Sequence, residues 1–148
     1  MAADETPAQQ MRELPPVDEA GYAALAQLRA GIRSYLAWAE QRAGEHGLTP
    51  AHVQLALAIR AHDDPAGPTL TELSDTLLLK HNSVVGLVDR AEQSGMVRRA
   101  PDPEHGSRVH VQLTDDGAQV LESVSRLHLE WLRENGAEMA RIWSSFER

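Results

Sequence analysis

The sequence contains no cysteine, and this absence excludes disulfide bonds, thiolate metal sites and thiol-based redox switches. Aromatic residues make up only 4% of the chain, so a core has to be built from Leu, Val, Ile and Ala. No stretch reaches the roughly 20 apolar residues of a membrane span, and the start MAADETPAQQ lacks the basic and apolar segments of a secretory signal. We therefore expect a cytoplasmic protein with no membrane partner.

Positive charge is also in short supply. The 14 Lys and Arg residues stand against 22 Asp and Glu residues, which gives a formal net charge of −8. The deficit is uneven, because residues 80–113 hold five basic and four acidic residues, whereas the rest of the chain holds nine and eighteen. Affinity for DNA depends largely on neutralising phosphates, so residues 80–113 are the part suited to face DNA, with a modest affinity.

Motifs for catalysis and metal binding are missing as well. The sequence has no Gly-rich phosphate loop, no nucleophile elbow and no carboxylate pair whose placement can be argued. His46, His52 and His62 are close in sequence, but they lack the three- or four-residue separation that pairs ligands on one helix. We predict a protein that is not an enzyme, with no catalytic residues, metal site or cofactor.

An ordered pattern is present between residues 79 and 113. Four apolar residues recur at helical spacing and predict one buried helix face: Val84, Leu87, Val88 and Ala91. Gly95 then ends the helix. Residues 96–100 and 108–113 are strand-like, and the turn-rich PDPEHG lies between them. A helix followed by such a hairpin predicts a winged helix-turn-helix, with residues 49–113 as the DNA-binding domain.

Residues 49–79 supply the other helices of that domain. Thr49-Pro50 predicts the cap and first position of a helix that runs to Ala61 and is buried on nearly all sides. A second helix ends near Leu79, with four leucines facing inward: Leu70, Leu73, Leu77 and Leu78. Thr69 with Glu72 matches a capping box, but we favour Thr71 as the cap, with Thr69-Leu70 as a short strand beside the hairpin.

Long helices are predicted on both sides of the domain. Residues 1–17 form a disordered or extended arm, and Asp18 caps a helix that runs to about Ala43. A second long helix follows Thr114 and breaks or kinks at Asn135-Gly136. Apolar residues recur along both segments: Leu25, Leu28, Ile32, Tyr35 and Ala39 in the first, and Met139, Ile142, Trp143 and Phe146 in the second. Residues 18–48 and 114–148 therefore predict a helical dimerisation region.

Candidate DNA contacts cluster at the start of the helix 81–93 and in the hairpin. Asn82 suits adenine, Ser83 suits either kind of base edge and Val85 suits a thymine methyl group, although capping of the helix is the alternative for Asn82 and Ser83. The other candidates are His81 and Gly86 on the same face, and the phosphate-binding side chains Lys80, Arg90, Arg98, Arg99 and Arg108. Arg98 and Arg99 alternate on a strand, so one should face inward, and Asp89 should orient an arginine such as Arg108.

A small-molecule pocket is expected between the first two helices and the last. Tyr35, Trp38 and His52 are its candidate lining residues. The alternative is that Tyr35 and Trp38 pack within the core or across a dimer.

Four segments, LTELSDTLLL, SVVGLVDRAEQSGMVRR, PDPEHG and HVQLTDDG, resemble the MarR family of bacterial transcriptional regulators from about Gly21 onward. The resemblance implies a mainly α fold with a small β-hairpin wing, a winged helix-turn-helix with N- and C-terminal dimerisation helices. It also implies a homodimeric repressor that binds a pseudo-palindromic operator in double-stranded DNA and is released by a small aromatic or phenolic effector. The family's wing usually carries Asp-x-Arg, whereas His105, Gly106 and Ser107 align there and Arg108 follows. A helical dimeric protein-interaction module without sequence-specific DNA binding is the alternative function.

Overall fold

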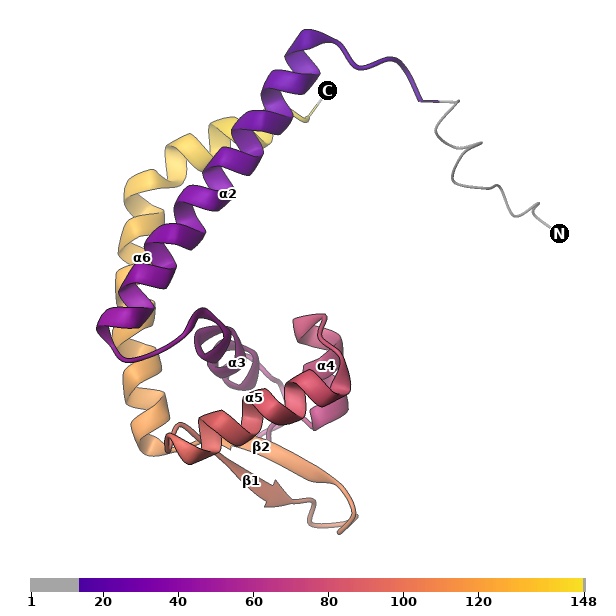
Figure 1. Cartoon of the computed structure of the whole chain (residues 1–148), viewed down its shortest axis with the longest axis vertical. Helices are drawn as coiled ribbons and strands as arrows, with labels where there is room; N and C mark the ends of the chain where they lie inside the picture. The colour runs from indigo at the N-terminus through magenta and orange to yellow at the C-terminus, as the bar shows by residue number, and fades with distance from the viewer. Residues whose placement is uncertain (1–13, 148) are drawn as a thin grey trace, which may run out of the picture. The chain divides into compact units, whose positions relative to one another are not determined.

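A computed structural model of the chain describes residues 14–147. Its elements are α2 (Glu19–Glu45), α3 (Pro50–Arg60), α4 (Leu70–Leu77), α5 (His81–Gln93), β1 (Val97–Pro101), β2 (Val109–Leu113) and α6 (Asp115–Ser144) (Figure 1). The mainly α fold with a two-stranded hairpin is thereby confirmed. None of the helices within the described residues has the length and apolar character needed to cross a bilayer. Most of the predicted N-terminal arm, residues 1–13, lies outside the described residues.

The described residues fall into two compact units. One is Leu36–Asn135, and the other consists of the described parts of Met1–Tyr35 and Gly136–Arg148. The helices α2 and α6 each pass from one unit into the other. The first unit contains the whole helix-turn-helix and its hairpin, so every candidate DNA contact lies within it.

The core of the Leu36–Asn135 unit is built from α3, α4, α5 and the hairpin. Its fully buried side chains come from all four: Leu55, Leu73, Val84, Val88 and Val111. The predicted inner face of α5 is confirmed. Helix α3 is less enclosed than its composition predicts, because the side chain of Leu57 is 44% exposed.

The starts of α3 and α4 follow from their capping residues. Thr49 caps α3 as predicted, with its hydroxyl accepting a hydrogen bond from the backbone N–H of His52 at 3.2 Å. The preference for Thr71 as the cap of α4 is wrong. Thr69 is the N-cap, and it forms the full capping box with Glu72 while also pairing in an isolated β-bridge with His110. The cap and the strand-like pairing are compatible because an N-cap residue keeps an extended backbone.

Leu78 is another residue that the sequence pattern misplaces. It is 90% exposed, and its backbone is left-handed, with φ of 54°. The αL conformation ends α4 and turns the chain toward α5, and this reversal carries the side chain away from the core. Helical spacing predicted it to face inward, and that periodicity no longer applies after the last helical residue.

The hairpin pairs β1 with β2 in an antiparallel register that runs from Val97 opposite Leu113 to Pro101 opposite Val109. The loop before α4 packs against β2, the second strand of the hairpin. Gly67 in this loop has φ of +90°, and a side chain there would collide with the backbone carbonyl of Val111. Only glycine allows this approach, so the loop lies directly against β2.

The first turn of α6 is attached to the start of β1. The backbone N–H of Thr114 donates to the Met96 carbonyl at 3.0 Å, and the Thr114 hydroxyl accepts from the Gly117 N–H at 3.0 Å. A side chain at position 117 would overlap the Met96 carbonyl. Helix α6 therefore packs closely on the end of the hairpin.

The predicted break at Asn135-Gly136 is absent, since α6 is continuous from Asp115 to Ser144. The side-chain amide of Asn135 donates to the Trp131 carbonyl one turn earlier, at 2.9 Å, so it supports the helix and does not end it. A glycine inside a helix costs only about 1 kcal/mol relative to alanine, which the packing of a long helix can offset.

The second unit is a pair of helical segments from the start of α2 and the end of α6. Asp18 caps α2 as predicted, accepting from the Gly21 N–H at 2.8 Å. A Cβ atom on Gly31 would lie 3.2 Å from Cδ1 of Ile142, so the two segments are in close contact at this point. Ile142 is buried. Several large apolar residues of this unit remain 42–64% exposed: Tyr22, Leu25, Ile32, Trp143 and Phe146.

Candidate nucleic-acid interface

The first turn of α5 presents its side chains to solvent. Its N-cap residue is Lys80, which makes no side-chain capping hydrogen bond. His81, Asn82 and Ser83 lie within the helix and are all exposed. Capping of α5 therefore does not account for Asn82 and Ser83. The first turn contains no acidic residue, so the partial positive charge of the helix N-terminus is not neutralised there.

Gly86 creates a flat site in the middle of the exposed face of α5. A Cβ atom built on Gly86 would lie 3.3 Å from Nη1 of Arg90. The guanidinium group of Arg90 thus lies back over Gly86, toward the N-terminal half of the helix. Arg90 supplies the polar surface that the missing side chain at position 86 leaves open.

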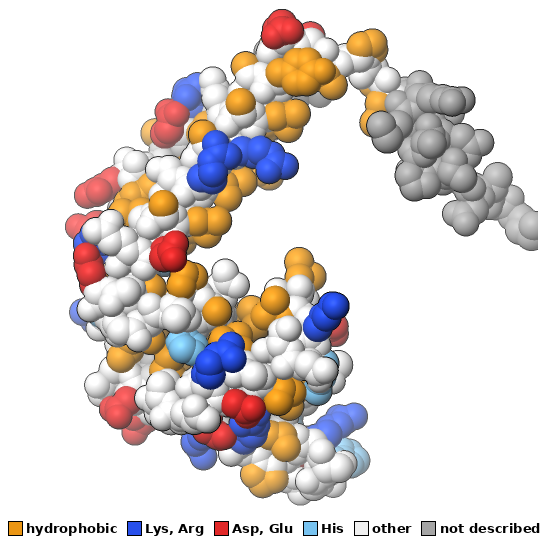
Figure 2. Space-filling model, viewed as in Figure 1, with side chains coloured by type: hydrophobic (Ala, Val, Ile, Leu, Met, Phe, Trp, Pro, Cys, Tyr) orange, Lys and Arg blue, Asp and Glu red, His pale blue; other side chains and the backbone are white. Residues whose placement is uncertain are grey.

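A cleft of about 470 Å³ separates this helix start from the hairpin. It is lined by residues from the start of α4, by His81, by Ser107 and Arg108 in the turn before β2, and by Val109. In Figure 2, side chains in the Lys/Arg colour and in the His colour lie next to each other at the free end of the hairpin. The structure therefore brings the candidates His81 and Arg108 to two sides of one cleft.

Arg99 is bound by two carboxylates. Its Nη2 donates to Oδ1 of Asp89 at 2.7 Å, and its Nη1 donates to Oε1 of Glu92 at 2.9 Å. Partial burial disfavours its charge, but the hydrogen bonds to Asp89 and Glu92 outweigh burial and raise the pKa of Arg99. The expectation that Asp89 orients an arginine is confirmed, but that arginine is Arg99 and not the suggested Arg108. Arg98 is exposed on the strand, as the alternation predicted for one of the pair.

The predicted effector residues do not all lie in one unit. Trp38 and His52 belong to the Leu36–Asn135 unit, and Tyr35 to the other. Trp38 stacks on Trp131 with ring centroids 5.5 Å apart, and it meets the ring of His128 edge-to-face with centroids 5.1 Å apart. The sequence prediction missed His128, which precedes Trp131 by one helical turn. Within residues 14–147 no three His, Asp or Glu side chains are grouped to hold a metal ion.

His52 is half-buried, and no hydrogen-bond partner for its buried Nε2 atom is found among the described residues. Burial is the main cause that lowers the pKa of His52, and the positive charge of Arg90 adds to it. The ring is therefore held in its neutral form at neutral pH.

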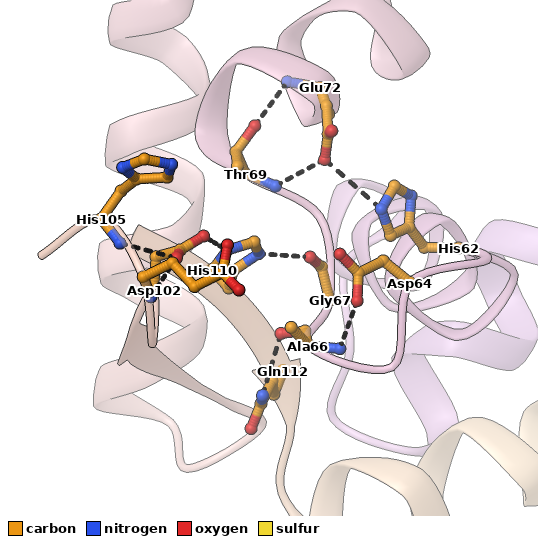
Figure 3. Close-up of polar contacts among 11 residues, drawn as sticks. His62, Asp64, Ala66, Gly67, Thr69, Glu72, Asp102, His105, His110 and Gln112 are labelled. Carbon is orange, nitrogen blue, oxygen red and sulfur yellow. Dashed lines mark hydrogen bonds and ion pairs between the residues drawn. The ribbon is translucent and has the colours of Figure 1, made fainter. Parts of the chain in front are cut away.

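A polar cluster that the sequence prediction also missed lies behind the wing (Figure 3). The ring of the buried residue His110 contacts the Gly67 carbonyl through Nδ1 at 2.6 Å and Oδ2 of Asp102 through Nε2 at 2.7 Å. The hydrogen bond to Asp102 is the main cause that raises the pKa of His110. The same hydrogen bond, with two from backbone N–H groups, lowers the pKa of Asp102. The only sign of this polar cluster in the sequence is the polar residue His110 in the mainly apolar strand VHVQL.

The MarR family model matches residues 46–106, from the residue that follows α2 to the wing, which is less than half of the chain. The transcriptional regulator PecS of Dickeya dadantii is 24% identical to it over 86 residues, which are 58% of this chain and 52% of PecS. The chain spans about half the length of the curated relatives it matches.

Solved structures of MarR-family regulators share the fold. AbsC from Streptomyces coelicolor has a TM-score of 0.73 with 14% identity, covering 85% of this chain and 84% of AbsC. A mutant of S. aureus MepR bound to an oligodeoxyribonucleotide has a TM-score of 0.65 with 18% identity, covering 85% of this chain and 96% of MepR. The MarR-family resemblance predicted from the four sequence segments is thereby confirmed.

Proposed function

We propose that the protein is a homodimeric DNA-binding transcriptional repressor that recognises a pseudo-palindromic operator. The observation that carries the proposal is the exposed first turn of α5, which lies across a cleft from Arg108 of the wing. In a winged helix-turn-helix the second helix enters the major groove with its N-terminal residues at the base edges. The MepR mutant bound to an oligodeoxyribonucleotide, which shares this fold, supports a nucleic-acid ligand.

The chemistry of the first turn suits a DNA major groove. Asn82 can bind adenine through two hydrogen bonds, and Ser83 can bind either kind of base edge. Lys80 and Arg98 supply the positive charge for phosphates on either side. Arg90 lies over Gly86, so in this proposal it faces the bases or the adjacent backbone.

A second copy of the chain is the proposed partner of the helical ends. The unit formed by the starts of α2 and the end of α6 leaves Ile32, Leu25 and Trp143 substantially exposed. Large apolar side chains left exposed in this number on one unit favour an interface with a partner. A symmetric dimer would place two copies of α5 about one turn of duplex apart, which is why the proposed operator is pseudo-palindromic.

Small aromatic molecules are the proposed effectors, with Trp38 and His52 as binding residues. Trp38 belongs to an aromatic pair with Trp131, beside which an aromatic molecule could pack, and the buried Nε2 atom of His52 has no hydrogen-bond partner among the described residues. A ligand that binds the DNA-free conformation more tightly would release the operator. Thermal-shift measurements with benzoate and 4-hydroxybenzoate test this part, because a bound ligand raises the melting temperature. Loss of the shift in Trp38→Leu but not in Trp143→Leu is expected, and no shift with either acid would refute it.

DNA binding is tested by fluorescence anisotropy with the duplex upstream of the protein's own gene. Asn82→Ala should lose preference at one base pair, whereas Lys80→Ala and Arg108→Ala should weaken binding to all sequences and reduce its salt dependence. Arg126→Ala is the matched control, because it removes one positive charge from an exposed site on α6. Binding that ignores both sequence and salt would instead indicate the protein-interaction module.

Dimerisation is tested by sedimentation equilibrium. Ile32→Glu places a charge on the exposed apolar surface and should shift the protein toward the monomer. Gln27→Glu adds the same charge at an exposed polar position of the same helix and should leave the dimer intact. A wild-type protein that remains monomeric at micromolar concentration would exclude the dimeric operator complex.

A further inference from the structure

The wing is fastened to the loop before α4 by contacts from three successive residues of β2. The Val111 N–H donates to the Pro68 carbonyl at 2.9 Å, and the Gln112 amide donates to the Ala66 carbonyl at 2.9 Å. The ring of His110 contacts the carbonyl of Gly67, the residue between Ala66 and Pro68, at 2.6 Å. The first two contacts hold the strand itself, whereas the His110 ring also extends to the tip of the wing.

Both ring nitrogens of His110 face hydrogen-bond acceptors. Nδ1 faces the Gly67 carbonyl, and Nε2 faces the Asp102 carboxylate at 2.7 Å. A neutral imidazole has one donor and one acceptor, whereas an imidazolium has two donors. Only the protonated ring can therefore satisfy both contacts. His110 is 6% exposed, so water does not readily replace either partner.

Asp102 organises the tip of the wing. Its Oδ1 accepts hydrogen bonds from the N–H groups of Glu104 at 2.8 Å and His105 at 2.9 Å. The backbone closes the same turn, with the Asp102 N–H donating to the Arg108 carbonyl at 3.0 Å. The Arg108 N–H in turn donates to the His105 carbonyl at 2.9 Å. The positions of His105 and Arg108 in the tip thus depend on one carboxylate, Asp102, which His110 contacts (Figure 3).

We propose that His110 is a positioning residue for DNA binding: its imidazolium ring fixes Asp102 against the loop and so sets where the wing presents His105 and Arg108 to the duplex. The inference rests on the proposed DNA-binding function and adds a residue that does not touch DNA. With the ring neutral, one of the two contacts loses its donor, and a nitrogen lone pair faces either a carboxylate or a carbonyl oxygen. The tip would then be free to move.

A dependence of DNA affinity on pH follows. The charged and titratable groups around His110 come from the wing tip, from the loop and from α4: Asp102, Glu104, His105 and Arg108; His62 and Asp64; and Glu72. The carboxylates Asp102 and Asp64 both favour the charged ring and raise the pKa of His110 above 6.5. His62 and Glu72 pair with each other at 3.3 Å. Affinity should therefore fall as the pH rises through the raised pKa of His110.

The decisive experiment is a double-mutant cycle between His110→Gln and Arg108→Ala in the full-length protein, read by anisotropy on the operator duplex. Glutamine keeps one donor but cannot bridge the two acceptors. In the wild-type background Arg108→Ala should weaken binding about tenfold, the usual effect of losing one charge-assisted contact. In the His110→Gln background the same change should cost less than about threefold, since the wing no longer presents Arg108. Equal losses in both backgrounds would overturn the proposal.

A second variant and a second readout separate positioning from general stability. Asp102→Asn keeps the Oδ1 acceptor and places an amide N–H donor opposite Nε2, so a neutral His110 ring can hold both contacts. Its cycle with Arg108→Ala should therefore keep the wild-type coupling at neutral and alkaline pH, where the protonated ring is no longer needed. Affinity measured from pH 6 to 9 should fall in the wild type and become flatter in both variants, and parallel profiles would contradict the proposal.

Nuclear magnetic resonance tests the wing without DNA. Backbone relaxation of residues 104–108 should show increased motion in His110→Gln but not in Asp102→Asn, with β1 and β2 unchanged. If the wing loosens in His110→Gln while no protein binds the duplex, the DNA-binding function fails and the positioning of the tip stands. If the wild type binds and the tip stays rigid in His110→Gln, the positioning role fails alone.

Discussion

Asp89 on α5 accepts a hydrogen bond from the guanidinium group of Arg99 on β1 at 2.7 Å. Glu92, one turn further along α5, takes the other terminal nitrogen at 2.9 Å and the Arg99 backbone N–H at 3.0 Å. The exposed helix of the helix-turn-helix and the first strand of the wing are thus joined by one arginine. Both terminal nitrogens of Arg99 donate to carboxylates within the protein, whereas Arg98 is exposed.

The two neighbouring arginines should consequently respond differently to substitution. Arg99→Ala leaves two carboxylates without their shared cation and should lower the free energy of unfolding by about 1 kcal/mol, a value typical of a partly exposed ion-pair network. Arg98→Ala should leave the stability unchanged and weaken DNA binding. Urea denaturation and anisotropy on the same preparations measure both. The reverse pattern would show that Arg99 is the residue that contacts DNA.

Leu78→Gly should stabilise the protein. A leucine in the left-handed region costs about 1–2 kcal/mol, and this side chain is 90% exposed, so its removal loses almost no burial. The larger conformational entropy of glycine in the unfolded chain offsets part of this stabilisation. The free energy of unfolding should therefore rise by about 0.5–1 kcal/mol. Leu77→Gly is the control, because Leu77 packs against the core and its loss should destabilise. Thermal melts of both variants decide the point.

Gly86→Ala is expected to raise stability and lower operator affinity together. Alanine is favoured over glycine inside a helix by about 0.5–1 kcal/mol. The new methyl group would meet only the flexible end of Arg90, at 3.3 Å from Nη1. That guanidinium group must shift, and its contact with DNA shifts with it. A variant that binds the operator as tightly as the wild type would show that the surface over Gly86 takes no part in recognition.

Folding stability should depend on pH through the pair His110 and Asp102. The pKa of His110 is raised in the folded protein, so its contribution is complete below about pH 6.5 and is lost as the pH rises through the folded value. The pKa of Asp102 is lowered, so its contribution is present above 3.8 and is lost as the pH falls toward the folded value. Urea midpoints should decline on both sides of this range in the wild type. In His110→Gln the alkaline decline should be smaller.

Local patterns predicted those parts of the fold in which neighbouring residues decide the structure. The period of α5, the cap at Thr49 and the start of α2 at Asp18 all depend on residues within one or two turns. The inward orientation of Leu78 and a break of α6 at Asn135-Gly136 were predicted wrongly, whereas a kink at Asn135-Gly136 stays a prediction. At Leu78 a left-handed backbone interrupts the helical period, and at Asn135 a side chain that often ends helices binds back to its own helix.

At the candidate interface, too, the sequence predicted the features that depend on neighbouring residues and missed those that depend on distant ones. Exposure of Asn82 and Ser83 follows from their place on a periodic helix. The partner of Asp89 and the role of His110 depend on how the hairpin packs, and the hydrogen bond from His110 to Gly67 joins residues 43 positions apart. A sequence pattern carries no information on which of several arginines will reach a given carboxylate across such a distance.

The attachment of α6 to the hairpin limits how the protein can respond to any signal. Thr114 binds the Met96 carbonyl, and Gly117 sits so close to it that no bulkier residue fits. The base of β1 and the first turn of α6 must therefore shift as a rigid body. A rotation of α6 would therefore be transmitted directly to the hairpin. Any substitution at position 117 should weaken this coupling between α6 and the hairpin.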